Sequence, residues 1–304
     1  MVKLLLKIIP YYFIARIYYL LFKNKKDKFN DTLQNKGYKF LKDLDISRYK
    51  TSTKLFVIGS GYSLNNISDS EWKYINENDS LGFGFSFLNE DHIPTFYSIE
   101  STVNREPNEF GRNKIGELFY RLFLTRKEAY KNVIKIVSDL DEKNITHFEN
   151  FGRDLFDKNL YTVNTVNGIG NTEEKFKKLI KYYNQIGLFE RKNKIDKLFK
   201  FRATLSMAIS FGIKLGYKEI ILCGIDLSDP RYFFEDNIKY PNLPDFYFVQ
   251  KNMKHVTMSR NPLFVPINIV VKTIYEGVCK EKGIKLYVQN PESALAEFLP
   301  IYKF

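Results

Sequence analysis

Short apolar runs alternate with amphipathic stretches along residues 54–304, and this pattern predicts alternating strands and helices. The most regular helical stretch is 201–218, in which Ala203, Met207, Phe211 and Leu215 recur every four residues. Strands are expected at 55–58, 80–88, 94–101, 132–139, 219–226 and 284–291, with further helices at 266–283 and 293–300. Such alternation is typical of an α/β, Rossmann-like fold with a mainly parallel sheet and helices on both faces.

Two stretches of this region lack a clean period. Residues 140–200 are charged and rich in Asn, and we expect them to form a helical, mobile or acceptor-facing insertion. Residues 227–262 are polar, aromatic and contain Pro, which favours a loop or lid.

The first predicted strand ends in a glycine turn, Gly59-Ser60-Gly61, which is followed by a helix that Ser68 is placed to cap. This order of elements opens many nucleotide-binding domains, where backbone N–H groups hold phosphate. Ligands in parallel sheets bind beyond the carboxyl ends of the strands. Glu100 and Asp226 end two other predicted strands, so a site is expected there; for Asp226 we favour a structural role at the lid.

The first 23 residues are strongly apolar but are interrupted by Lys3, Lys7, Arg16 and Lys23. The uncharged runs are too short to span a bilayer, which takes about 20 apolar residues. Aromatic and aliphatic groups mixed with cations suit a helix lying in the membrane interface, and the basic segment 23–28 favours an anionic leaflet. A helix packed on the α/β domain is the alternative. We therefore divide the chain into a membrane-associating helix with linker, 1–50, and one α/β domain, 51–304, with its lid at 227–262.

Charge and composition narrow the class of partner. The formal net charge of +12 suits an anionic partner, either a membrane surface or an acidic substrate. No zinc-finger spacing, RNA-binding motif or dense Arg run is present, so nucleic acid is not expected. Cys223 and Cys279 stand far apart and predict no redox role. The acidic run 139–141 is interpreted as the start of a helix rather than a metal pair, so neither metal nor other cofactor is expected.

Three segments together resemble the bacterial lipooligosaccharide sialyltransferases of glycosyltransferase family 42. They are VIGSGYSL (57–64), RATLSMAISFGIKLGYKEIILCGID (202–226) and GIKLYVQNPESALAEF (283–298). The central segment, which ends in G-I-D, is the most specific, and the resemblance covers about residues 54–304. It implies a single Rossmann-like domain with a lid, CMP-sialic acid as donor, inversion at the anomeric carbon and no metal.

The resemblance also implies roles for individual residues. Tyr232 matches a lid tyrosine that hydrogen-bonds the departing phosphate, and His255 lies in the loop where the family carries its catalytic base. The donor would be held by Gly59, Ser60, Gly61, Ser63, Arg202, Thr204 and Ser206.

The sequence departs from the family at several positions. Strict alignment places Met258 rather than His255 at the base position, and Ser228 replaces a family tyrosine. Glu100 is the alternative base. The donor therefore stays open between sialic acid and other CMP-activated acidic sugars (CMP-nonulosonates such as pseudaminic acid, or CMP-Kdo).

The function predicted from the sequence is transfer of such a sugar to a cell-surface glycan acceptor (lipooligosaccharide, O-antigen or capsule). The enzyme is expected to be peripheral, at the cytoplasmic face of the bacterial inner membrane. It is expected to be either a monomer or a homo-oligomer. The alternatives are a Maf-like enzyme and a non-catalytic binding protein of related fold. A dinucleotide oxidoreductase is disfavoured, because Gly59 and Gly61 are followed by Leu64 where the dinucleotide motif has its third Gly.

Overall fold

The computed structural model of the chain describes residues 11–100, 112–142, 144–155, 158–168, 170–235, 239, 255–259, 262 and 264–304. Its strands are β1 (Lys54–Ile58), β2 (Asp79–Phe83), β3 (Phe96–Glu100), β4 (Ile134–Ser138), β5 (Leu160–Val166), β6 (Lys197–Phe199), β7 (Glu219–Cys223) and β8 (Lys285–Val288). Its α-helices are α2 (Tyr11–Asn35), α3 (Asp69–Asn76), α4 (Arg112–Arg126), α5 (Ile145–Phe151), α6 (Glu173–Gln185), α7 (Thr204–Lys214) and α8 (Ile267–Ile274). Short 3₁₀ turns are η1 (Leu41–Asp43), η2 (Ile46–Tyr49), η3 (Tyr62–Asn66), η4 (Gly84–Leu88) and η5 (Val256–Met258), and a π-turn, η6 (Tyr275–Cys279), extends α8.

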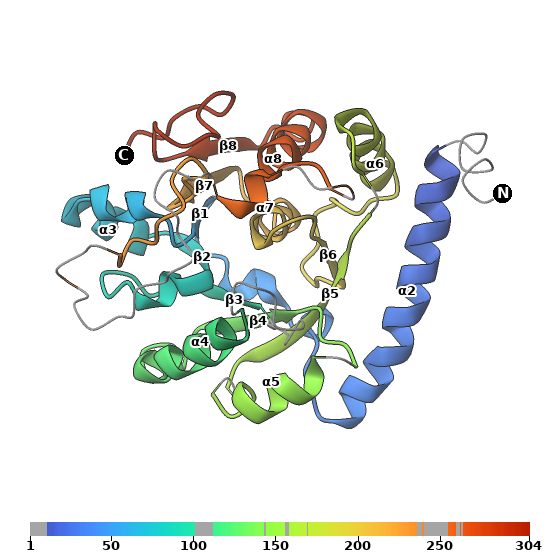
Figure 1. The fold of residues 1–304 in the computed structure, drawn as a ribbon, viewed down its shortest axis with the longest axis horizontal. Coiled ribbons are helices and arrows are strands. Elements are labelled where there is room, and N and C mark those ends of the chain that lie inside the picture. The colour runs from blue at the N-terminus through green and yellow to red at the C-terminus, as the bar shows by residue number, and fades with distance from the viewer. Residues whose placement is uncertain are drawn as a thin grey trace.

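The eight strands form one parallel sheet in the order β6-β5-β4-β3-β2-β1-β7-β8 (Figure 1). From β1 the chain moves outward in one direction as far as β6. It then crosses back through α7 and continues on the other side of β1 with β7 and β8. The order of strands therefore reverses between β1 and β7, and in open α/β sheets the ligand crevice lies outside the carboxyl ends at such a point.

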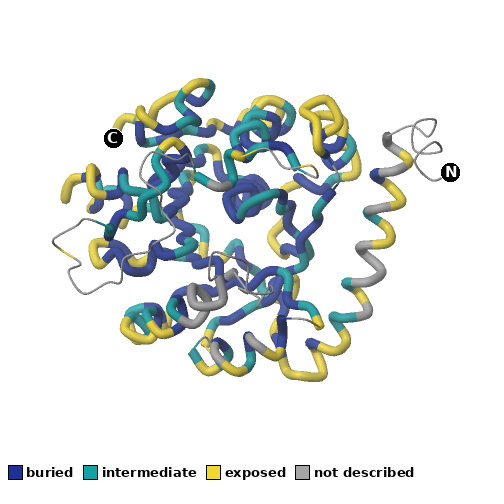
Figure 2. The backbone as a smooth tube through the Cα atoms, viewed as in Figure 1, coloured by how far each residue is buried: buried dark blue, intermediate teal, exposed yellow. Residues whose placement is uncertain are grey.

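Both faces of the sheet are buried, because successive side chains of a strand point to opposite faces. In β1, Leu55 and Val57 belong to the apolar cluster that contains the buried faces of α6, α7 and α8. Phe56 and Ile58 belong to the cluster that contains the buried faces of α3, α4 and α5. Figures 1 and 2 show these two helical layers with the buried sheet between them. The predicted α/β fold with helices on both faces is confirmed.

Three predictions about elements were wrong. The second strand stops at Phe83, because Gly84 takes a left-handed φ of 63° and the chain turns into η4. Residues 140–200 are no insertion, since they supply α5, β5, α6 and β6 to the layers of the fold. The expected helix at 293–300 is a series of turns: the N–H of Ala294 donates to the carbonyl of Asp226, and the Ser293 hydroxyl donates to the carbonyl of Ile225. These bonds hold the segment against the loop that follows β7.

Helix α2 lies along the outer side of the molecule and contacts α6 and β5 (Figure 1). Ala15 and Leu33 are buried, and the ring of Tyr19 lies 6.2 Å from that of Tyr183. Part of the segment predicted to bind the membrane is thus packed on the domain, and residues 1–10 lie outside the described residues. Of the helices that the structure describes, none combines the length and hydrophobicity needed to cross a bilayer.

Candidate functional site at the carboxyl edge of the sheet

The glycine turn after β1 is held directly against the loop after β7. The N–H of Gly59 donates to the carbonyl of Cys223 and the N–H of Gly61 to the carbonyl of Gly224, each at 2.8 Å. A Cβ at Gly59 would lie 2.5 Å from the Gly224 oxygen, and one at Gly61 would lie 2.4 Å from Oδ2 of Asp226. Glycine is required here by the close approach of the two loops that flank the reversal of strand order.

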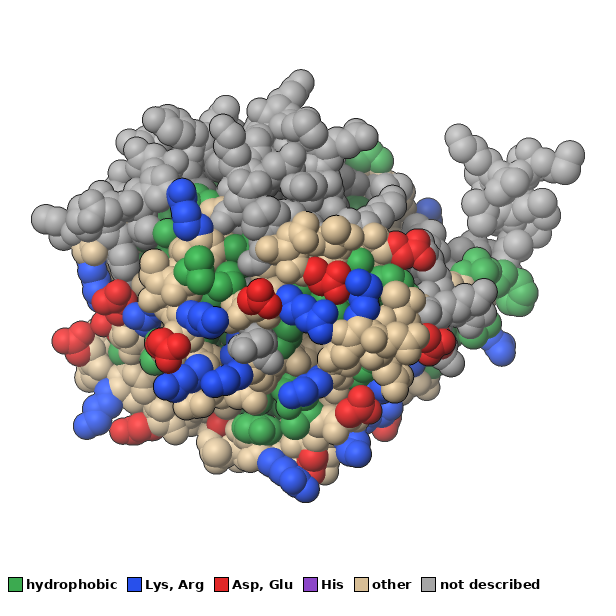
Figure 3. All heavy atoms as spheres, turned by 90° about the horizontal axis from the view of Figure 1, so that it is seen from below, with side chains coloured by type: hydrophobic (Ala, Val, Ile, Leu, Met, Phe, Trp, Pro, Cys, Tyr) green, Lys and Arg blue, Asp and Glu red, His purple; other side chains and the backbone are tan. Residues whose placement is uncertain are grey.

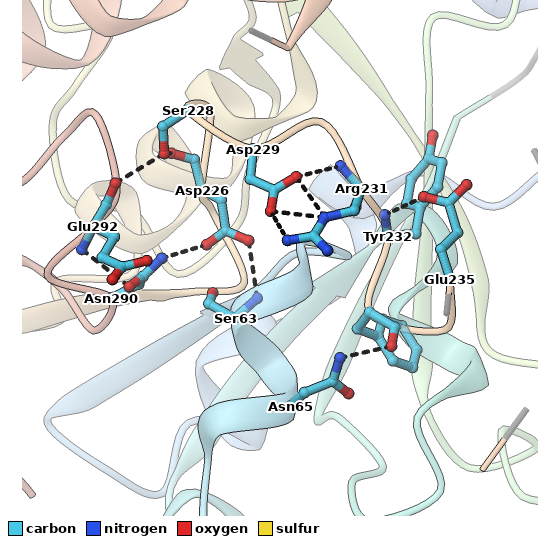
Figure 4. Close-up of polar contacts among 11 residues, drawn as sticks. Ser63, Asn65, Asp226, Ser228, Asp229, Arg231, Tyr232, Glu235, Asn290 and Glu292 are labelled. Carbon is cyan, nitrogen blue, oxygen red and sulfur yellow. Dashed lines mark hydrogen bonds and ion pairs between the residues drawn. The ribbon is translucent and has the colours of Figure 1, made fainter. Parts of the chain in front are cut away.

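Asp226 ties three loops of this edge together (Figure 4). Its side chain is only 3% exposed. Oδ2 accepts a hydrogen bond from the N–H of Ser63 at 3.0 Å, and Oδ1 accepts one from the amide of Asn290 at 2.8 Å. The carboxylate thus connects the loops after β1, β7 and β8, which is a structural role of the kind that the sequence favoured.

Tyr232 lies beside the glycine turn. It forms an antiparallel bridge with Gly61, and the next residue, Phe233, donates its N–H to the carbonyl of Ser60 at 3.1 Å. The amide of Asn65 donates to the Phe233 carbonyl at 2.8 Å (Figure 4). These contacts place the backbone of Tyr232 beside the turn that the sequence assigned to the donor phosphate, and its ring packs against the rings of Phe85 and Phe234, with centroids 5.5 and 5.2 Å away.

His255 reaches the same edge through the loop after β7, since its N–H donates to the carbonyl of Leu227 at 3.1 Å. Its Nδ1 lies 2.7 Å from the Thr257 hydroxyl oxygen and 3.3 Å from the Thr257 N–H nitrogen. Burial lowers the pKa of the imidazole, and the positive charge of Arg202 lowers it further. Both shifts favour the neutral imidazole at pH 7, and its Nδ1 is hydrogen-bonded to Thr257.

The start of α7 carries the three other predicted donor contacts. The Arg202 guanidinium donates to the carbonyls of Thr257 and Ser259, at 3.4 and 3.1 Å, and thereby holds the segment that carries His255. The Thr204 hydroxyl is buried without a hydrogen-bond partner in the described part of the chain, as is the hydroxyl of Ser63. The Ser206 hydroxyl is fully buried.

Ser206 is bound within its own turn. Its hydroxyl oxygen accepts from the N–H of Phe201 at 2.8 Å and lies within 2.9 Å of the carbonyls of Phe201 and Ala203. These hydrogen bonds stabilise the turn that leads into α7. Direct contact between Ser206 and the sugar donor stays a prediction.

Backbone strain gathers at this edge. Asp139, Arg202 and Leu227 have left-handed φ angles of 61°, 70° and 57°, and they follow β4, β6 and β7 respectively. A left-handed conformation is costly for most residues other than Gly, Asn and Asp, so Arg202 and Leu227 keep it only because the surrounding contacts enforce it. Strain of this kind concentrates at functional sites, so its position supports the carboxyl edge as the site.

A second polar cluster lies at the ends of β4, β5 and β6. Asp139 pairs with Lys26 at 3.3 Å and with Lys200 at 3.2 Å, and it accepts a hydrogen bond from the Thr165 hydroxyl. Although burial by itself raises the pKa of Asp139, the charges of Lys200 and Lys26 hold it below the usual range. The carboxylate of Asp139, the first residue of the segment 139–141, is thus paired with two lysines. In the described ranges, no group of three or more His, Cys, Asp or Glu is arranged to hold a metal ion.

Most of the predicted site residues lie on segments that are joined to one another by hydrogen bonds: Gly59, Ser60, Gly61, Ser63, Tyr232, His255 and Arg202. Glu100 ends β3 with its backbone paired to Ser138, and its side chain lies outside the described residues, as does the centre of the predicted lid. Sequence reasoning missed Thr257 and the Lys200–Asp139 pair. A hydroxyl two residues after a histidine was the available signal for Thr257.

A comparison with protein-family models and with curated proteins finds no match for the chain. The argument for function therefore depends on the geometry of this edge.

Proposed function

We propose that the chain is an inverting, metal-independent glycosyltransferase, which moves sialic acid or a related acidic sugar from its CMP-activated form to a cell-surface glycan acceptor. One observation supports the proposal: Tyr232 is bridged to the glycine turn at Gly61, and His255 donates its N–H to the carbonyl of Leu227, so the backbones of both residues lie along the loops where the strand order reverses. A turn of this kind suits a phosphate, and a neutral imidazole suits a hydroxyl that must lose its proton.

In the proposed reaction the bond between the anomeric carbon and the phosphate oxygen breaks, and its electron pair leaves with CMP. The acceptor hydroxyl oxygen bonds to the anomeric carbon from the opposite side, and its proton passes to the base. The N–H groups of the glycine turn and the Tyr232 hydroxyl stabilise the charge that develops on the leaving phosphate. The hydroxyls of Ser63 and Thr204, which are buried without partners among the described residues, are suited to hydrogen-bond the donor.

His255 is the proposed base, and its tautomer matters. Proton uptake at Nε2 needs the form in which Nδ1 carries the hydrogen, and this form is satisfied when Nδ1–H donates to the Thr257 hydroxyl at 2.7 Å. In this tautomer the 3.3 Å contact between Nδ1 and the Thr257 N–H is lost as a hydrogen bond, because both groups are then donors. Thr257 is therefore a positioning residue for His255 in this proposal.

The test measures CMP released from CMP-sialic acid, CMP-pseudaminic acid and CMP-Kdo, with a glycan acceptor and with EDTA present. We expect release from one of these donors, and we expect His255→Ala to lower transfer by about 10²–10⁴-fold, the usual scale for a general base, while CMP binding is retained. Thr257→Val should lower transfer in the same direction, whereas Thr125→Val, on the exposed side of α4, should leave it unchanged.

The pH profile gives a second readout. Because the pKa of His255 is lowered, the acidic limb of transfer should fall below the ordinary imidazole value of about 6.5. The proposal is overturned if the protein binds no CMP, or if EDTA abolishes release and Mn²⁺ restores it. If His255→Ala keeps full transfer while Glu100→Gln loses it, Glu100 is the base.

A further inference from the structure

Helix α2 has two contrasting faces. Ala15 and Leu33 are 5% and 1% exposed, and the Tyr19 hydroxyl accepts a hydrogen bond from Lys197 at 2.6 Å, so this face is packed on the domain. Four large apolar side chains are exposed on the same helix, and they form what we call the outer apolar face: Phe13 (53%), Ile17 (42%), Leu20 (45%) and Leu21 (67%).

The outer apolar face lies opposite the packed face. At about 100° per residue, its four side chains fall within an arc of about 100°, and the centre of that arc is on the far side of the helix from Ala15, Tyr19 and Leu33. In Figure 3, hydrophobic side chains gather at the right-hand edge of the molecule, where α2 runs. Single exposed apolar residues are ordinary on a protein surface, but a contiguous set over successive turns marks an interaction surface.

We propose that the outer apolar face of α2 docks into the surface of a bilayer that contains anionic lipid. A helix that lies in the interface buries one apolar face among the acyl chains and keeps cations near the headgroups. The exposed Arg16 lies between Phe13 and Ile17 in the sequence and at the edge of the apolar arc on the helix. Three further lysines follow in the sequence at 23, 25 and 28. The exposed acids Asp27 and Asp31 come only in the later turns, which restricts docking to the first half of α2.

The charge pattern favours lipid over a second copy of the chain. A symmetric dimer through this face would bring the same patch of each copy together, and with it the same cations. Like charges across an interface oppose association, whereas anionic headgroups attract all of them. The contacts of Tyr19 and Leu33 with the domain leave the outer apolar face free to dock, so α2 would attach the whole catalytic domain to the membrane.

The test uses the full chain and vesicles, without donor or acceptor, so its outcome is independent of the proposed function. Co-sedimentation is measured with phosphatidylcholine vesicles and with vesicles that also contain phosphatidylglycerol. We expect binding to the second kind, weakened by salt, and a loss of about tenfold in the partition coefficient for each large side chain removed. The variant is Phe13→Ser with Leu21→Ser, and its matched control is Leu124→Ser, which changes a 51% exposed leucine on α4.

We expect circular dichroism to show that both variants keep the fold, because none of these side chains is buried. The proposal is overturned if the double variant binds phosphatidylglycerol vesicles as tightly as the unmodified protein does, or if Leu124→Ser weakens binding equally. It is also overturned if the double variant converts a dimer to a monomer with no effect on vesicle binding, because the outer apolar face would then be an interface between copies of the chain.

Discussion

Replacing Asp226 by Ala would leave two donors without their acceptor at the reversal of strand order. The carboxylate is 3% exposed and accepts from the Ser63 N–H at 3.0 Å and the Asn290 amide at 2.8 Å. A buried donor left unpaired costs about 1–3 kcal/mol. Removing the carboxylate also relieves the cost of keeping a charge away from water. We therefore expect Asp226→Ala to lower the free energy of unfolding by about 2–4 kcal/mol.

The assay is urea unfolding followed by the fluorescence of Trp72, the single tryptophan, which is buried in α3. Asp229→Ala is the matched control. It removes the same kind of side chain from the same loop, but the partners of Asp229 are the guanidinium and the N–H of Arg231, and both side chains are about one-third exposed (Figure 4). Exposed ion pairs contribute about 1 kcal/mol or less, so the control should cost much less than Asp226→Ala.

A double-mutant cycle tests whether the cost of Asp226→Ala comes from donors that have lost their acceptor. Asn290→Ala removes one of these donors. The double variant should therefore be more stable, by about 1 kcal/mol or more, than the sum of the two single effects predicts. Additivity within about 0.5 kcal/mol, or an equal cost for Asp229→Ala, would refute the role given to Asp226.

Two further predictions follow from the same structure. Gly61→Ala should lower the free energy of unfolding by about 1–3 kcal/mol and weaken CMP binding, because its Cβ would lie 2.4 Å from Oδ2 of Asp226. The control is Gly277→Ala, whose Cβ would meet nothing nearer than 3.7 Å and which should therefore change stability little. Equal effects of the two substitutions in unfolding and CMP titrations would contradict this account. Burial lowers the pKa of His92 to about 4, so the unfolded chain takes up the proton first as pH falls. The contribution of His92 to stability should then be constant above about pH 6.5 and fall by roughly 3 kcal/mol between pH 6.5 and pH 4. His255, whose pKa burial also lowers, adds to the total decline. Urea titrations across this range should therefore show a shallower decline for His92→Gln than for the unmodified protein, and an unchanged slope would count against this account.

The helical stretch around Met207 and Phe211 and the apolar run of β1 were predictable because their burial depends on local pattern. Strands buried on both faces are continuous apolar runs, and β1 and β7 have this form. Strand β5 was missed because two half-buried positions interrupt its buried ones, and polar residues lie within and around it. The turns at 293–300 looked helical because only their bonds to the β7 loop distinguish them from a helix.

The sequence by itself determined the α/β class, the glycine turn after the first strand and the edge of the sheet where a site should lie. Only the tertiary structure decided that Gly59 and Gly61 are required by the neighbouring β7 loop, and that Asp226 joins three loops. It also decided that Arg202 holds the segment that carries His255, and that α2 keeps one apolar face uncovered while the other is packed. The physical reason is that hydrophobic periodicity reports only whether a position is buried, whereas these features depend on which distant segment supplies the neighbouring atoms.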